Sequence, residues 1–266
     1  MHVNIGHWIR KNAQLFATKD ALIVANRSVT YAQMNDRVNR LTNKLHSLGL
    51  EKGDRIGALL LNSIEYLELL FACAKKGYVL VPLNFRLSAP ELEFILNDCT
   101  PKALFFDPFF ASLVAPLKES VSSLGHFVET PILGGGEYDS AFIDDSSPAE
   151  ALDESVGGDD NVLIMYTAGT TGRAKGVVLT HDNCFAQSVN GWALGIAPNI
   201  VSLVVLPLFH VGGLNGSVTP MLHVGATTVL VPKFDPAEVL ALVEKHYVNG
   251  IMGVPTVHQM LMEHPN

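Results

Sequence analysis

Strand-like and helix-like segments alternate along most of this sequence. Apolar runs at 54–62, 78–84 and 102–107 read as strands, and the segments at 63–77 and 89–99 between them read as helices. Parallel strands need long crossover connections, and helices usually supply them. We therefore expect an α/β fold with largely parallel sheets flanked by helices.

Short polar motifs mark where these helices begin. Each motif places a capping side chain three residues before a Gln or Glu that can reach back to the start of the helix. Glycine accepts the left-handed backbone that ends many helices, so Gly49 and Gly77 are predicted to end the first two. The predicted capping pairs are Thr30 with Gln33, Asn62 with Glu65, and Ser88 with Glu91.

Residues 134–160 interrupt the alternation. They contain many acidic residues, no Lys or Arg, and glycines near both ends. This composition is typical of a surface connection, in which we expect one short helix. We predict a first α/β subdomain at 1–150 and a second at 151–266. In the second, strands are expected at 161–167, 176–180, 200–208, 226–232 and 250–255, and helices from about 182, after 213 and at 236–247.

The composition excludes several classes of protein. The 266 residues can bury a sizeable core, and the formal net charge of −8 argues against binding nucleic acid or an anionic membrane surface. No run of about 18 apolar residues is present, so no membrane span is expected. Cys73, Cys99 and Cys184 form no C-x-x-C pair, and the N-terminus has no signal-peptide pattern, so we expect a cytoplasmic protein.

A segment rich in Gly and Thr lies between two apolar runs, at 167–175. Glycines allow backbone N–H groups to converge on one point, Thr hydroxyls add donors, and Lys175 adds a charge, so the loop can surround a phosphate. The spacing matches neither a Walker A loop nor G-x-G-x-x-G. From spacing alone, a phosphate loop and a flexible turn between two buried strands both remain open.

The segment "YTAGTTGRAKGV" (166–177) resembles the signature loop of the adenylate-forming superfamily, which comprises acyl-CoA synthetases, luciferases and peptide synthetase adenylation domains. The segments at 74–98 and 204–213 are similar to further motifs of this superfamily, in the same order. The resemblance covers nearly the whole chain but only the first half of the family enzyme. Ala168 and Ala174 stand where the family usually has serine and proline.

This resemblance implies the roles of specific residues. The loop would hold the pyrophosphate end of ATP, and Lys175 and His210 would be the catalytic residues. His210 would also border the acyl pocket with Gly212 and Gly213. The implied cofactors are ATP, Mg²⁺ and coenzyme A, and the implied substrate is a small-molecule carboxylic acid. The implied phosphate contacts are Thr167, Gly169, Thr170, Thr171, Gly172 and Lys175.

Other residues have simpler explanations. His181 and Cys184 are too few for a zinc site, so no metal site is expected, and we interpret 180–183 as a helix cap. Arg86 is a surface arginine or, by resemblance, lies near coenzyme A. Without the resemblance, the simpler interpretation of His210 is a histidine at the end of a strand whose side chain is capped by backbone groups.

We therefore predict the N-terminal portion of an AMP-forming acyl-CoA synthetase. By resemblance, the residues that contact adenine, ribose and Mg²⁺, and the adenylation lysine, belong to the later half of the family enzyme. Alternatives are a non-catalytic nucleotide-binding fragment or a peptide synthetase adenylation domain. A half domain also leaves apolar surface uncovered, so we expect self-association.

Overall fold

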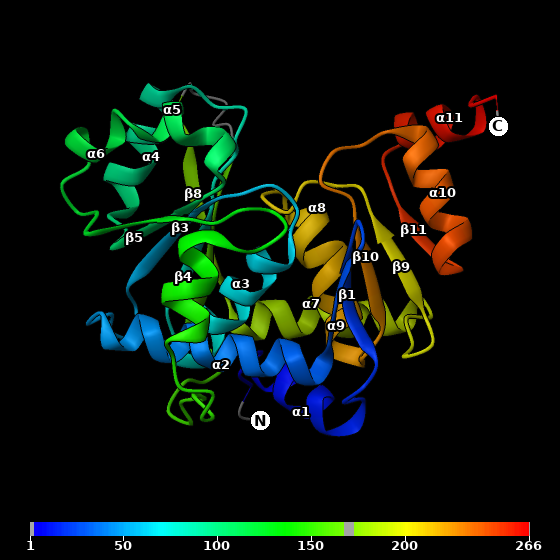
Figure 1. Cartoon of the computed structure of the whole chain (residues 1–266), viewed down its shortest axis with the longest axis horizontal. Coiled ribbons are helices and arrows are strands. Elements are labelled where there is room, and N and C mark those ends of the chain that lie inside the picture. Colours follow the sequence, from blue (N-terminus) through cyan, green and yellow to red (C-terminus); the bar gives the residue numbers. More distant parts are fainter. Residues whose placement is uncertain (1–2, 168–172, 266) are drawn as a thin grey trace.

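The computed structural model describes residues 3–167 and 173–265, and in this part of the chain the strands form two sheets (Figure 1). The five-stranded sheet has the order β11 (Gly250–Met252), β9 (Val201–Val204), β10 (Thr227–Leu230), β1 (Asp20–Val24) and β2 (Arg27–Thr30). The six-stranded sheet has the order β6 (His126–Glu129), β5 (Ala103–Phe106), β3 (Arg55–Leu59), β4 (Val79–Pro82), β7 (Asn161–Thr167) and β8 (Lys175–Thr180).

Most neighbouring strands in both sheets run parallel. The antiparallel pairs are β1 with β2 and β7 with β8. Each of these pairs has a short connection, whereas a parallel pair needs a crossover long enough for a helix. The predicted α/β fold with largely parallel sheets is therefore confirmed.

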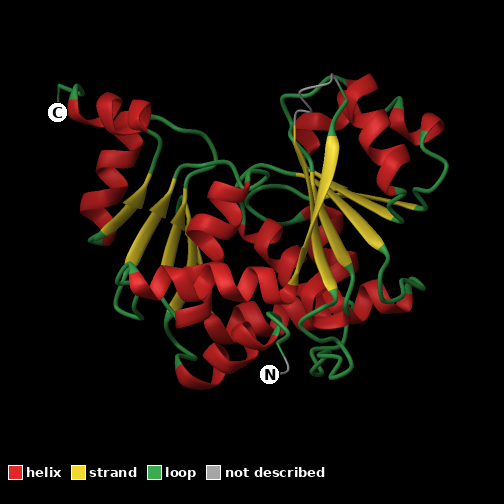
Figure 2. Cartoon of the chain, turned by 180° about the vertical axis from the view of Figure 1, so that it is seen from behind, coloured by secondary structure: helices red, strands yellow, loops and turns green. Residues whose placement is uncertain are grey.

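Helices fill the space between the sheets and cover their outer faces (Figure 2). One core cluster joins both sheets, because Leu22 of β1, Val204 of β9 and Ile56 of β3 all belong to it. No helix in the described ranges is long and apolar enough to cross a membrane. The helices between the sheets are α1 (His7–Leu15), α2 (Tyr31–Ser47), α3 (Ile64–Lys76), α7 (His181–Ala193) and α9 (Thr219–Val224). The helices on the outer faces include α4 (Ala89–Cys99), α5 (Ala111–Val114), α6 (Leu117–Ser120), α10 (Pro236–His246) and α11 (Pro255–Met262).

Two of the three predicted capping pairs are present as expected. Thr30 caps α2 and Ser88 caps α4, each in a reciprocal capping box, and Gly77 ends α3 in the left-handed conformation with φ 77°. The prediction for Asn62 was wrong. Ser63 caps α3 instead, since its hydroxyl accepts a hydrogen bond from Tyr66 N at 3.1 Å. The Asn62 amide makes long-range bonds that a local motif does not reveal.

The connection at 134–160 contains the predicted short helix, at Tyr138–Asp144, but this helix is not purely a surface feature. Tyr138, Phe142 and Ile143 are buried, and the Phe142 ring packs edge-on against Phe105 at 5.5 Å. Each sheet also combines strands from both sides of residue 150, so a division there does not coincide with a boundary between sheets. The subdomains 1–150 and 151–266 stay a prediction about folding units.

The strands on either side of the Gly-rich segment differ in burial. Val162, Leu163 and Met165 of β7 are buried, as expected. The expectation that β8 is also buried was wrong, because Val177 and Val178 are 46% and 45% exposed. β8 is the last strand of its sheet and pairs with β7 alone among the described strands, so one of its edges is unpaired. Its residues 175–178 are all exposed, so neither face is covered there.

A buried charge cluster joins α2, α3, β2 and the 134–160 connection. Glu65 and Glu68, one turn apart on α3, each have an arginine partner and a fully buried side chain. Because an unpaired buried charge is costly, these contacts hold the four elements together. The cluster consists of Arg27 with Glu65, Arg37 with Glu68 at 2.5 Å and Asp139 at 2.7 Å, and Tyr138, whose hydroxyl donates to Glu68 at 2.6 Å.

This cluster predicts a pH-dependent stability. Burial and the nearby Glu68 charge raise the pKa of Glu65 to about 7, although Arg27 opposes the shift. A raised pKa in the folded state stabilises the fold below the unfolded value of 4.5, and this contribution is lost as the pH rises through about 7. We expect the unfolding free energy of the wild type, relative to Glu65→Gln, to fall across this window. The measurement is urea unfolding at about pH 5 and pH 8, and an unchanged difference would contradict the assignment.

Candidate functional site

A cavity of about 810 Å³ lies between the two sheets, at the carboxyl ends of their strands. It is bounded by residues that follow β4, by the end of β7 and by the segment after β9. Ligands in α/β proteins bind preferentially outside the carboxyl ends of parallel strands, so this is the position expected for a site. The lining residues are Pro82, Asn84, Leu87, Pro90, Glu91, Phe94, Ile95, Met165, Tyr166, Thr167, Arg173, Ala174, Phe209, His210 and Val211.

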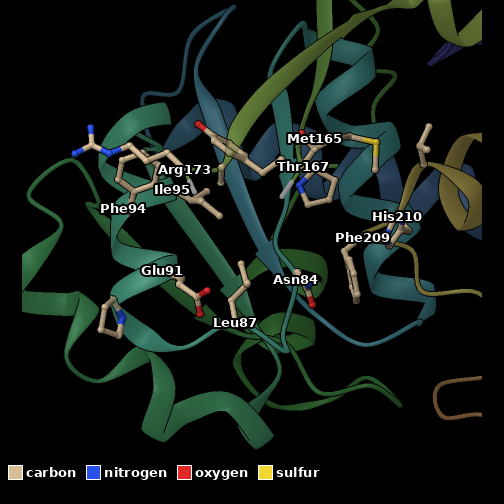
Figure 3. Close-up of a pocket in the computed structure, with 15 residues that line it drawn as sticks. Asn84, Leu87, Glu91, Phe94, Ile95, Met165, Thr167, Arg173, Phe209 and His210 are labelled. Atoms are coloured by element: carbon tan, nitrogen blue, oxygen red, sulfur yellow. The ribbon is translucent and has the colours of Figure 1, made fainter. Parts of the chain in front are cut away.

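Two opposing walls define this cavity (Figure 3). Phe94 and Ile95 of α4 form one wall, and Phe209 and His210 form the other. Thr167 lies between them, at the end of β7. The Ser88 capping box fixes where α4 begins along the chain, and the packing of α4 on the six-stranded sheet places its wall. The walls are mainly apolar and aromatic, with a few polar groups, which is typical of a small-molecule site.

The predicted phosphate contacts are only partly within the described residues. Thr167 and Lys175 are paired across the antiparallel β7–β8 ladder, and Thr167 lines the cavity. Lys175 is exposed next to it and is not among the lining residues. Ala168 and the predicted contacts Gly169, Thr170, Thr171 and Gly172 lie outside the described residues.

Arg173 also lines the cavity, although the sequence analysis gave it no role. Its guanidinium lies 5.8 Å from the centre of the Phe94 ring, which places a permanent positive charge on the first wall. Together with Lys175, it makes the exit of the Gly-rich segment cationic. This arrangement can stabilise an anion beside Thr167.

His210 is positioned by the turn that follows β9. Its backbone N–H donates to Pro207 O at 3.1 Å, and its carbonyl accepts from Gly213 N and Leu214 N, both at 3.0 Å. The His210 side chain makes no capping bond to the short helix that follows it, α8 (Val211–Gly213); it lines the cavity and is exposed.

The two glycines after His210 do not line the cavity themselves. A Cβ on Gly213 would overlap the carbonyl of Pro207, so a side chain there would displace the turn. A Cβ on Gly212 would meet Leu206 Cδ1 at 3.8 Å, an ordinary van der Waals contact, so position 212 has room for one. The roles predicted for Gly212 and Gly213 in binding substrate stay predictions, and packing already explains why position 213 is glycine.

Several polar cavity residues were missed by the sequence analysis. The Tyr166 hydroxyl donates to Asp98 at 2.5 Å, and burial together with this contact raises the pKa of Tyr166. Asn84 lies two residues after the end of β4, and its Oδ1 accepts a hydrogen bond from Arg86 N at 3.0 Å. A polar residue at the carboxyl end of a predicted parallel strand is the signal that could have identified Asn84.

The remaining residues singled out from the sequence lie outside the cavity. His181 is buried, and its Nδ1 accepts from Ile5 N at 3.0 Å, while burial lowers the pKa of His181 to about 4. Thr180 caps α7 in a capping box, as predicted. Arg86 is exposed beside the cavity, 5.9 Å from the centres of both the Phe85 and Phe209 rings. Within the described ranges, no group of three or more His, Cys, Asp or Glu residues could hold a metal ion.

Comparison with known proteins gives a consistent result. The sequence profile described as "AMP-binding enzyme" matches residues 9–266. A feruloyl-CoA synthase from Amycolatopsis sp is 40% identical over 262 residues, which cover 98% of this chain and 50% of that protein. An indoleacetate–CoA ligase from Aromatoleum aromaticum is 35% identical, with 99% of this chain and 52% of that protein covered. This chain thus spans about half the length of these curated relatives.

Solved structures of similar proteins have the same fold as this chain. The inhibitor-bound N-terminal domain of FACL13 from Mycobacterium tuberculosis superposes with a TM-score of 0.90 at 32% identity. The match covers 99% of this chain and 66% of that domain. ATP-bound MatB from Rhodopseudomonas palustris is also 32% identical, with a TM-score of 0.85, and the match covers all of this chain and 52% of MatB.

Proposed function

The chain belongs to the AMP-binding enzyme family, and we propose that the whole protein is an acyl-CoA synthetase that activates a small carboxylic acid with ATP. One observation carries the proposal within this chain. Thr167 lines a largely apolar cavity and is paired in the sheet with the exposed Lys175. Arg173 lines the same cavity beside Phe94, and His210 stands on the wall opposite α4 (Figure 3). An anion site next to an apolar cavity suits a reaction between a phosphate and an acyl group.

The proposed reaction has two steps. A carboxylate oxygen attacks the α-phosphorus of ATP and pyrophosphate leaves, which gives acyl-AMP. The thiolate of coenzyme A then attacks the acyl carbon and AMP leaves. Lys175 and the Thr167 hydroxyl would stabilise the departing pyrophosphate, and His210 would orient the carboxylate. We propose that Mg²⁺ accompanies ATP, and by the resemblance its protein contacts belong to the later half of the family enzyme.

We propose coenzyme A as the acyl acceptor and the cytoplasm as the compartment. Both relatives compared above are named as forming CoA thioesters. A relative from Streptomyces coeruleorubidus, 33% identical, is instead named a fatty acid–[acyl-carrier-protein] ligase, so the acceptor needs a direct test. Cys73, Cys99 and Cys184 are buried free thiols, which supports a reducing compartment. A long-chain-fatty-acid–CoA ligase, 34% identical, supports a role in fatty acid metabolism.

The anion site can be tested by direct binding. We expect the chain to bind pyrophosphate or ATP at about millimolar concentration, since binding of this strength needs only about 4 kcal/mol. Lys175→Ala removes a charge-assisted hydrogen bond of roughly 1.5–3 kcal/mol, so affinity should fall roughly 10- to 100-fold in an NMR titration. Lys245→Ala is the control, because Lys245 is an exposed residue on α10 that bonds to Asn26. Equal affinities for both variants would contradict the assignment of Lys175.

We also propose that copies of this chain associate through uncovered apolar surface. Val177 and Val178 of β8 and Trp192 of α7 are 46%, 45% and 48% exposed. An exposed apolar edge strand readily pairs with another chain. Light scattering should therefore detect oligomers whose fraction increases with concentration and decreases in Val178→Lys. A monomer at all concentrations would refute the proposal.

A further inference from the structure

We propose that Asn62 is a positioning residue that holds the His210-bearing segment of one sheet against the other sheet. This inference rests on the proposed function for its catalytic meaning. The contacts by which Asn62 holds this segment do not depend on any ligand. By fixing the turn at 206–210, Asn62 would set the distance between the two walls of the cavity.

Asn62 lies where the two sheets meet. It follows β3 of the six-stranded sheet, close to the carboxyl ends of the parallel strands, and only 4% of it is exposed. Its Nδ2 donates to Leu206 O and to Val231 O, both at 3.0 Å. Its Oδ1 accepts from Leu208 N at 2.9 Å. Leu206 and Leu208 follow β9, and Val231 follows β10, so all three partners belong to the five-stranded sheet and its loops.

These three bonds use both N–H groups and the carbonyl oxygen of the amide. Such a set is matched by asparagine and by no other side chain of the same size. Aspartate would place an oxygen against two carbonyls, and leucine would leave three buried backbone groups without partners. The loss of a partner for a buried polar group costs about 1–3 kcal/mol each.

A short chain of contacts links Asn62 to His210. Asn62 bonds to the backbone on both sides of Pro207, and the Pro207 carbonyl accepts from His210 N at 3.1 Å. The Phe209 ring packs edge-on against Phe85 at 5.0 Å, on the six-stranded sheet side. The segment is thus held by Asn62 at its base and by an aromatic contact near the cavity.

A role in stability alone would predict a different result from a role in positioning. Loss of global stability increases hydrogen exchange throughout the core. Loss of positioning increases exchange at 206–210 and changes the environment of the His210 ring while the core stays protected. The two roles can therefore be separated in one sample.

The experiment compares Asn62→Ala with Asn43→Ala in the whole 266-residue chain. Asn43 is the control for loss of an interelement amide, because its Nδ2 also bonds to two carbonyls of a distant segment, Ser147 O and Ala149 O at 2.9 Å. These bonds are exposed, and Asn43 does not line the cavity. We measure amide exchange at Leu208 and His210, and the NMR signals of the His210 ring, assigned with His210→Gln. Asn62→Ala should lower protection at both amides about tenfold or more and shift or broaden the ring signals.

Asn62→Asp gives a second, graded measurement. The ionised carboxylate can still accept from Leu208 N but repels the carbonyls of Leu206 and Val231, whereas the protonated form can donate to one of them. Protection at His210, the amide beyond Leu206 in this turn, should therefore recover on acidification. Unchanged protection and ring signals in Asn62→Ala, or a uniform loss of protection throughout the core, would overturn the proposal. If Asn62→Ala does not fold, the absence of any pH-dependent recovery in Asn62→Asp would overturn it.

Titration of the same samples with pyrophosphate separates the two proposals. Failure of the wild-type chain to bind pyrophosphate would count against the proposed function and leave the exchange result on Asn62 intact. Normal binding in Asn62→Ala, together with altered His210 signals, is the expected result, because Lys175 and Thr167 belong to the six-stranded sheet.

Discussion

The 266-residue chain, purified by itself, is expected to show no carboxylate-dependent exchange of pyrophosphate into ATP. The chain spans about half the length of its curated relatives, and the resemblance assigns the adenine, ribose and Mg²⁺ contacts and the adenylation lysine to the later half of the family enzyme. Each absent charged contact would remove a few kcal/mol of transition-state stabilisation, and every 1.4 kcal/mol is about tenfold in rate. The loss of several contacts amounts to many orders of magnitude.

The measurement is pyrophosphate exchange with a panel of carboxylic acids, including ferulate and indoleacetate. Lys175→Ala serves as the control for contaminating activity, because it should give the same background as the wild type. Exchange by the wild type that disappears in Lys175→Ala would show that this half is sufficient for adenylation. The expectation would then be wrong, while the assignment of Lys175 would gain support.

Lys75→Met is expected to destabilise the fold by about 3 kcal/mol. The Lys75 side chain is fully buried, and its ammonium bonds to Asn35 at 2.8 Å, Asn39 at 2.5 Å and Glu150 at 2.6 Å. Methionine keeps the apolar stem but removes the ammonium from Asn35, Asn39 and Glu150. Glu150 retains only the longer contact with Arg10 at 3.8 Å and a bond from Leu152 N. Glu150 is 34% exposed and regains some hydration, so we expect the lower end of the range for broken buried pairs.

The neighbouring lysine provides the control for this prediction. Lys76 forms an ion pair with Asp153 at 3.3 Å, with side chains 28% and 29% exposed, and such pairs contribute about 0–1 kcal/mol. Urea unfolding should therefore separate Lys75→Met clearly from Lys76→Met. Equal losses in the two variants would show that the bonds of Lys75 contribute little beyond ordinary surface pairing.

Features that depend on neighbouring residues were predictable from the sequence. The helix starts at Thr30 and Ser88 and the helix end at Gly77 depend on side chains and backbone within one turn, so the local pattern is sufficient. The alternation of strands and helices was enough for the α/β class, because parallel strands require helical crossovers. The family signature at 166–177 indicated the family before any geometry was known.

The tertiary structure decided what depends on distant residues. Asn62 and Ser63 both qualify as helix caps by type, but the Asn62 partners lie 144 to 169 residues away, and the capping role therefore falls to Ser63. The apolar run at 177–179 suits a buried or an edge strand equally well, and only the strand order places β8 at an edge. Likewise, no local pattern brings His210, Phe94 and Thr167 to one cavity, because they come from separate elements whose proximity depends on how the two sheets pack.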